Sequence, residues 1–295
     1  MNKNKGYYLV LSTAIISGFA IFINQFGVKV SHPYVFTFLK NTMVAVLLFS
    51  LILILKDRKQ LTNIKKKQWL QLILIGLIGG SIPFLLFFKG LSLTTSIGGA
   101  FLHKTIFIYI ALFAAIFLKE KISKKYFLGG LFLVLGNLFL LKQISFSIDT
   151  GSLLILLATL FWAVENVISK YVLRELPGKV VALGRMFFGS LFIFLFLLFS
   201  GQAPLLMELN LIQIGWVSLT GLLLFGYVIT WYSGLKYIPV SKAAVILLLG
   251  SPITSLLYFI QTGQITYPAI LGIFLIAVGA GIALGLKPIY RYVRA

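Results

Sequence analysis

The chain has 295 residues, of which 60% are hydrophobic and 11% are charged, and its formal net charge is +20. Soluble domains average about 25% charged residues, so this composition excludes an ordinary water-soluble fold. The absence of cysteine excludes disulfide bonds and thiolate chemistry.

Apolar runs follow one another along the whole chain, and a membrane-spanning helix needs about 20 mainly apolar residues. The runs are too long and too uniformly apolar for barrel strands, which alternate over about ten residues. We therefore predict an all-α integral membrane protein with ten transmembrane helices and no separate soluble domain. The first run is too long for a signal peptide and lacks a cleavage site, so we expect it to stay as a helix. The runs lie near 7–28, 34–55, 68–88, 96–117, 127–141, 151–170, 180–199, 213–235, 240–260 and 267–286.

Basic residues are distributed unevenly between the segments that join these runs. If the N-terminus is cytoplasmic and the chain changes side at each run, twenty of the 26 Lys and Arg residues fall inside and three outside. This bias is the positive-inside rule, and it predicts a multi-pass protein of the cytoplasmic membrane with both termini cytoplasmic. We expect the basic loops to face anionic lipid headgroups, which leaves no charge pattern that calls for nucleic acid.

The chain contains an internal repeat. KGLSLTTSIGGAFL from Lys89 aligns with SGLKYIPVSKAAVI from Ser233 at an offset of 144 residues. LGGLFLVLG from Leu128 and GYYLVL from Gly6 recur at offsets of 143 and 145. Three matches in the same order with a nearly constant offset predict two five-helix halves, 1–148 and 149–295.

Five helices per half is an odd number, so the second half enters the membrane from the opposite face. Inverted repeats of this kind are typical of secondary transporters, which bind substrate near the midplane between the halves. The alternative is a structural duplication without transport.

The segments GLSLTTSIGGAFLHKTIFIYIALFAAIFLKEKIS and GLKYIPVSKAAVILLLGSP resemble the EamA-type transporters of the drug/metabolite transporter superfamily. That family's fourth helix ends in Leu-Gly-Glu, and here Leu-Lys-Glu occupies 118–120. Phe107 stands where the first half usually has proline, which predicts a straighter fourth helix, and 261–264 lacks the usual acid. The resemblance spans the whole chain and implies a ten-helix carrier that exports a small metabolite.

Two cations inside the apolar runs are related by the repeat. Lys40 and Arg185 are 145 positions apart, and inverted topology places Lys40 toward the outer face and Arg185 toward the inner one. Ionisable residues within a span are costly and indicate a functional site. We therefore predict a substrate pathway between them, with snorkelling to the headgroups or structural pairing as the alternative.

His103 and Lys104 lie deep in the fourth run. Lys104 is a candidate for substrate binding because a buried cation without a counter-ion is costly. His103 is a second candidate, although a neutral histidine packed in the core is the commoner case.

The sixth run carries Glu165, the only acid within a span. Trp162, Asn166 and Ser169 form a polar and aromatic stripe beside it. Glu165 is predicted either to face the cavity, where a desolvated carboxyl is suited to proton coupling, or to neutralise Arg185 or Lys104. Further cavity walls are expected from Tyr109, Tyr227 and Trp231, with anchoring at the membrane interface as the alternative.

No enzyme motif, metal-ligand spacing or cofactor fingerprint stands out, so we predict a protein that is not an enzyme, with no cofactor and no metal. Gly76 with Gly80, and Gly281 with Gly285, have the spacing of closely packed helices.

The composite prediction is a secondary transporter that moves an anionic or zwitterionic metabolite, such as an amino acid or organic acid, by alternating access. One alternative is a proton-coupled exporter of a cationic or amine compound through Glu165. Another is a channel or lipid-handling protein. The expected partners are the small-molecule substrate and the lipid bilayer. The sequence leaves the oligomeric state open, and a homodimer is one arrangement that it allows.

Overall fold

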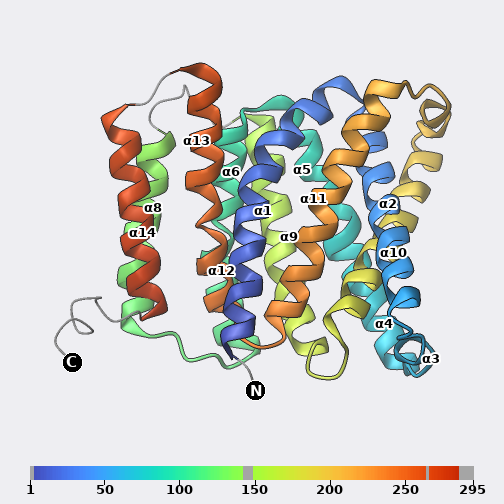
Figure 1. Cartoon of the computed structure of the whole chain (residues 1–295), viewed down its shortest axis with the longest axis horizontal. Helices are drawn as coiled ribbons and strands as arrows, with labels where there is room; N and C mark the ends of the chain where they lie inside the picture. The colour runs from blue at the N-terminus through green and yellow to red at the C-terminus, as the bar shows by residue number, and fades with distance from the viewer. Residues whose placement is uncertain (1–2, 142–148, 264–265, 286–295) are drawn as a thin grey trace.

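The computed structural model describes residues 3–141, 149–263 and 266–285, and this part of the chain is helical without a strand. The predicted all-α class is confirmed. The helices pack side by side in one bundle (Figure 1). They are α1 (Lys3–Val30), α2 (Pro33–Ile54), α3 (Lys59–Thr62), α4 (Lys66–Ile75), the π-helical turn η1 (Gly76–Ser81), α5 (Ile82–Leu93), α6 (Ser96–Lys104), α7 (Ile106–Phe117), α8 (Lys124–Leu141), α9 (Thr150–Val172), α10 (Gly178–Phe199), the 3-10 turn η2 (Ala203–Met207), α11 (Leu211–Leu235), α12 (Val240–Leu247), α13 (Gly250–Thr262) and α14 (Tyr267–Leu284).

Within the described residues, nine helical segments are long and apolar enough to cross a membrane. They comprise α1, α2, the segment from α4 to α5, most of α6 with α7, α9, α10, α11, α12 with α13, and α14. The remaining predicted span, 127–141, lies in α8, an 18-residue helix that opens with two lysines and is not among the nine. The chain is thus a multi-pass membrane protein, while the count of ten spans stays a prediction.

Successive spans run in alternating directions, and α1 begins at the end of the bundle where α14 finishes (Figure 1). The links between α2 and α4 and between α7 and α8, which carry the lysine clusters at 56–67 and 119–125, lie at this same end. We call it the basic end. The predicted location of the C-terminus rests partly on residues 286–295, which lie outside the described residues.

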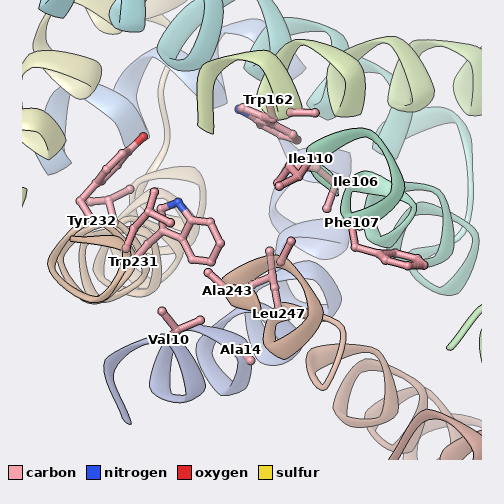
Figure 2. Close-up of a cluster of buried hydrophobic side chains, with 14 of the residues drawn as sticks. Val10, Ala14, Ile106, Phe107, Ile110, Trp162, Trp231, Tyr232, Ala243 and Leu247 are labelled. Atoms are coloured by element: carbon pink, nitrogen blue, oxygen red, sulfur yellow. The ribbon is translucent and has the colours of Figure 1, made fainter. Parts of the chain in front are cut away.

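If residues 3–141 and 149–285 are taken simply as the two halves of the chain, each half contributes one helix to each main helix pair of the bundle. Helix α1 packs on α11 and α5 packs on α9, while α2 packs on α10. The halves also meet where α6 contacts α13, where α7 contacts α12, and where α8 packs along α14. A core of large side chains fills the spaces between these pairs. In Figure 2, Trp231 of α11 and Leu247 of α12 lie in one apolar cluster with Val10 and Ala14 of α1.

Two of the spans are interrupted, and the local sequence explains both breaks. Pro252 near the start of α13 cannot donate a backbone hydrogen bond, and α12 ends at Leu247, shortly before it. Helix α6 ends before Thr105, whose hydroxyl donates to the carbonyl of Leu102 at 2.7 Å and so competes with the helical pattern. The expectation that Phe107 straightens this span stays a prediction.

Acidic side chains cap two helices. Glu120 accepts hydrogen bonds from the backbone N–H groups of Val240 and Ser241 at 2.9 and 3.2 Å, so it caps α12 from the other half. Asp149 accepts from the backbone N–H of Ser152 at 2.8 Å at the start of α9. This backbone hydrogen bond lowers the pKa of Asp149.

Glycines allow the closest helix contacts. A Cβ on Gly80 would lie 2.1 Å from the carbonyl oxygen of Arg185, and one on Gly76 would lie 2.4 Å from Cβ of Phe188. The predicted close packing at Gly76 and Gly80 is therefore present, against α10. The same prediction for Gly281 and Gly285 is wrong, because a Cβ on either would meet nothing within 4 Å.

Candidate functional site

A central cavity of about 80 Å³ lies between the two halves, with walls from α1, α2, α5, α6, α7, α9, α10 and α11. This volume is below the 300–1,000 Å³ of a typical small-molecule pocket. Five of the seven predicted site residues line this one cavity, namely Lys40, His103, Trp162, Asn166 and Arg185.

The ammonium of Lys40 is held on the cavity wall by neutral and aromatic groups. Its Nζ donates to Oδ1 of Asn24 at 3.0 Å and lies 3.4 Å from the ring centroid of Phe88 and 5.0 Å from that of Phe36. The side chain is 1% exposed. Lys40 therefore does not snorkel to the surface in this structure, and aromatic faces supply part of its stabilisation.

The guanidinium of Arg185 lines the same cavity from α10. Its Nε donates to the carbonyl oxygen of Gly79 at 3.1 Å, and the same oxygen accepts from Nε1 of Trp162 at 2.9 Å. Gly79 lies in η1, and π-turns of this kind are frequent at functional sites. Glycine is required here because a Cβ would lie 2.2 Å from Cγ of Glu165.

One aromatic ring lies close to both cations. The ring centroid of Phe84 is 5.9 Å from Nζ of Lys40 and 5.3 Å from Cζ of Arg185. The two positive charges therefore line the same cavity, and no carboxylate is among the residues that line it. Their field favours a bound anion.

Glu165 lies behind the cavity wall and does not line it. Its Oε1 accepts hydrogen bonds from the hydroxyl of Tyr232 at 2.7 Å and from the hydroxyl of Ser169, while its buried Oε2 has no partner among the described groups. Glu165 and Arg185 form no direct ion pair, since the described residues contain a single one, between Lys179 and Asp57. Tyr232 contacts both groups, since its hydroxyl donates to Glu165 and its ring centroid lies 5.7 Å from Cζ of Arg185.

Lys104 is also displaced from the wall. It is 1% exposed, and its Nζ donates to the hydroxyl of Ser17 at 2.8 Å. Ser17 lines the cavity, whereas Lys104 points toward the contact of α1 with α13, where Gly250 lies close to its Nζ. It can therefore act on a ligand only through Ser17 or after a rearrangement.

His103 and Asn166 extend the aromatic side of the cavity. The ring of His103 lies against Trp162 with centroids 5.1 Å apart, and its buried Nδ1 has no partner among the described groups. Asn166 accepts from Nε1 of Trp231 at 2.7 Å. Tyr227 stacks on Trp231 at 6.2 Å, so these two rings form a wall, whereas Tyr109 does not line the cavity.

Three phenylalanines of α5, at 84, 87 and 88, line the cavity and were missed by the sequence reasoning. Their spacing places them on one helix face, which is the only signal that sets them apart from the other 24 phenylalanines in the chain. An apolar side chain in a membrane helix gives no sign of whether it faces lipid, a neighbouring helix or a cavity.

Comparison with known proteins agrees with this architecture. The family model described as "EamA-like transporter family" matches residues 4–142 and again 149–285. The chain belongs to the EamA-like transporter family.

This EamA-like chain also resembles individual curated and solved proteins. It is 25% identical to the uncharacterized transporter YyaM of Bacillus subtilis over 97% of this chain and 95% of that protein. An uncharacterized transporter of Methanothermobacter thermautotrophicus is 26% identical over 59% of this chain, and the match spans 56% of that relative. A solved crystal structure matches with a TM-score of 0.75 over 96% of both chains at 19% identity, which shows the same fold. Family and fold together establish a membrane transporter.

Proposed function

We propose that this EamA-like transporter moves a small metabolite with a carboxylate or phosphate group across the cytoplasmic membrane by alternating access, in the outward direction. The observation that carries the proposal is the cavity itself, where Lys40 and Arg185 flank Phe84 and no acid lines the wall. An anionic substrate supplies the missing counter-charge, and the aromatic walls accommodate its less polar part.

The alternating mechanism rests on the proposed pair of inverted halves, 1–148 and 149–295. It is supported by the double match of the family model, by the pairing of helices across the halves, and by two breaks at equivalent places, since Thr105 and Leu249 are 144 positions apart. The cavity is too small for most metabolites, so substrate entry requires the halves to separate at one end.

Polar contacts join the two halves at the basic end in this structure. Glu120 caps α12, Lys179 pairs with Asp57, and Nε2 of Gln68 donates to Glu175 at 2.8 Å. A cycle that opens this end to the cytoplasm breaks these contacts and lets substrate reach Arg185, while opening of the other end exposes Lys40.

The test combines ligand identification with charge removal. A thermal-shift screen of purified protein against amino acids, organic acids, sugar phosphates and amines identifies the stabilising compound, whose counterflow is then measured in liposomes. Lys40→Gln and Arg185→Gln are expected to lower its affinity about tenfold to hundredfold, because a charged hydrogen bond contributes about 1.5–3 kcal/mol. Arg185→Lys is expected to impair transport as well, because lysine cannot bind a carboxylate bidentately.

Lys125→Gln, which removes an exposed cation at the basic end, is the matched control. Normal counterflow by a stable Lys40→Gln, Arg185→Gln double variant would falsify the anion site. Single-channel conductance in place of saturable counterflow would indicate a pore.

A second candidate function is the proton-coupled export of a cationic or amine compound through Glu165. It is favoured by one observation, the buried Oε2 of Glu165 that has no partner among the described groups. An amine that stabilises the protein in the same screen supports this function over anion transport.

A further inference from the structure

A second cavity, of about 420 Å³, lies on the other side of α10 from the central one. It is almost entirely apolar, with walls from α2, α4 and α10, and it is also lined by Leu61 of α3 and by Ile64 of the link that follows α3. Several side chains at its mouth are large, apolar and exposed, at 58% for Val46, 47% for Phe49, 39% for Trp69 and 52% for Phe187. In a membrane protein such a mouth opens into the hydrocarbon of the bilayer.

The rim of this side cavity is strongly cationic. Leu61 and Ile64 line the cavity, whereas Lys65 at the end of the link, and Lys66 and Lys67 in the first turn of α4, are exposed. Lys66 lies three residues before Trp69 and so shares its helix face, at the headgroup level that tryptophan prefers. Residues 56–67 contain six cations and one acid, Asp57, which is already paired with Lys179.

The geometry points to a specific lipid site. We propose that the side cavity holds an acyl chain of one anionic phospholipid from the leaflet at the basic end, with its phosphate on Lys65, Lys66 and Lys67. The apolar cavity, which opens sideways into the bilayer, suits the acyl chain of such a lipid, and the cationic rim suits its phosphate. The cavity alone would not select an anionic lipid, and the lysines alone would not hold an acyl chain. This goes beyond a general attraction of basic loops to the membrane, because it assigns one lipid to one cavity.

Helix α10 lines both the side cavity and the central cavity. Gly184 of α10 lines the side cavity and packs on Leu72 of α4, since a Cβ on Gly184 would lie 2.8 Å from Leu72 Cδ2. The next residue, Arg185, reaches the central cavity and touches Gly80 through its carbonyl oxygen. A lipid wedged between α2, α4 and α10 therefore supports the backbone that positions the cavity guanidinium.

Binding is tested on full-length protein in a neutral detergent, titrated with phosphatidylglycerol whose acyl chains carry bromine. The bromine is expected to quench tryptophan fluorescence, and Trp69→Phe is expected to remove that quenching although Trp162, Trp216 and Trp231 remain. Replacing Lys65, Lys66 and Lys67 together by glutamine is expected to weaken binding at least tenfold, and Val46→Phe, which fills the mouth from an exposed position without adding a tryptophan, is expected to do the same.

The matched control replaces Lys121, Lys124 and Lys125 by glutamine, which removes three exposed cations from another link at the basic end. An equal loss of binding in this control overturns the proposal, because the attraction is then a property of overall charge. Equal binding of brominated phosphatidylcholine overturns the headgroup assignment. If soluble glycerol 3-phosphate, which has no acyl chain, displaces the lipid completely, the cavity has no role in binding and the proposal is overturned. Preferential phosphatidylglycerol binding that requires both the three lysines and an open mouth supports the site.

Discussion

A helix suited to hydrocarbon carries Arg185 because the rest of the fold stabilises the charge. Insertion of an arginine near the centre of a membrane helix costs about 2.5–3.5 kcal/mol. The carbonyl of Gly79 and the rings of Phe84 and Tyr232 offset part of this cost. Arg185 also lines a cavity that has no acid among its lining residues, and this is why we propose that it binds an anionic ligand.

Glu165 offers a second test at the residue scale. If it carries a coupling proton, Glu165→Gln is expected to abolish proton-driven accumulation and to leave substrate exchange intact, because an amide accepts the same hydrogen bonds and cannot titrate. The measurement is uptake into liposomes with and without an imposed pH gradient, together with the thermal unfolding midpoint.

The control for this test is Ser169→Ala, which removes one hydrogen bond to Glu165 and leaves the carboxyl in place. It is expected to lower stability by about 1 kcal/mol and to keep proton coupling. A Glu165→Gln variant that fails to fold, or one that still accumulates substrate, shows that the carboxyl has a structural role.

At the scale of single elements, the pairing of α8 with α14 depends on glycine. A Cβ on Gly129 would lie 2.5 Å from the carbonyl oxygen of Gly279, and one on Gly136 would lie 2.7 Å from that of Gly272. Gly129 and Gly272 are 143 positions apart, as are Gly136 and Gly279, so the proposed repeat relates the two contacts to each other. Close backbone approach is the usual source of helix association in membranes, where no hydrophobic force drives it.

Two glycines of α14 give a matched pair of variants. Gly279→Ala is expected to destabilise the protein by about 1–3 kcal/mol, because the new methyl group overlaps the backbone of α8. Gly281→Ala is expected to leave stability unchanged or slightly higher, since its Cβ meets nothing within 4 Å. The thermal unfolding midpoint in detergent measures both, and equal midpoints for the two variants would contradict this account of the interface.

At the scale of the whole molecule, orientation in the membrane follows from where the basic links lie. Thr62 is exposed at the basic end, while Ser200 and Gln261 are exposed at the other end of the bundle. The positive-inside rule assigns the basic end to the cytoplasm. The native chain has no cysteine, so single introduced cysteines report their own positions without background.

In intact cells, the Ser200→Cys and Gln261→Cys variants are expected to react with a membrane-impermeant thiol reagent. The Thr62→Cys variant is expected to react only after the membrane is opened. The unmodified chain and labelling in detergent serve as controls for background and for access. Labelling of Thr62→Cys in intact cells excludes the proposed orientation.

The sequence by itself determined the membrane class and the positions of most spans, and it predicted the repeat, which stays a prediction. These features depend on local hydropathy and on offsets along the chain, which need no knowledge of neighbouring helices. It also selected Lys40, Trp162 and Arg185, because a polar group inside a span is rare enough to be seen without a structure.

Only the tertiary structure decided which of these groups share one cavity. Lys104 turns toward Ser17, Glu165 turns toward Tyr232, and the phenylalanines of α5 take their places on the wall. In a membrane helix, apolar side chains face lipid, neighbours and cavity alike, so the sequence pattern does not reveal how the helix is rotated about its axis. That rotation is fixed by close contacts such as those of Gly79 and Gly80, which form between segments far apart in the chain.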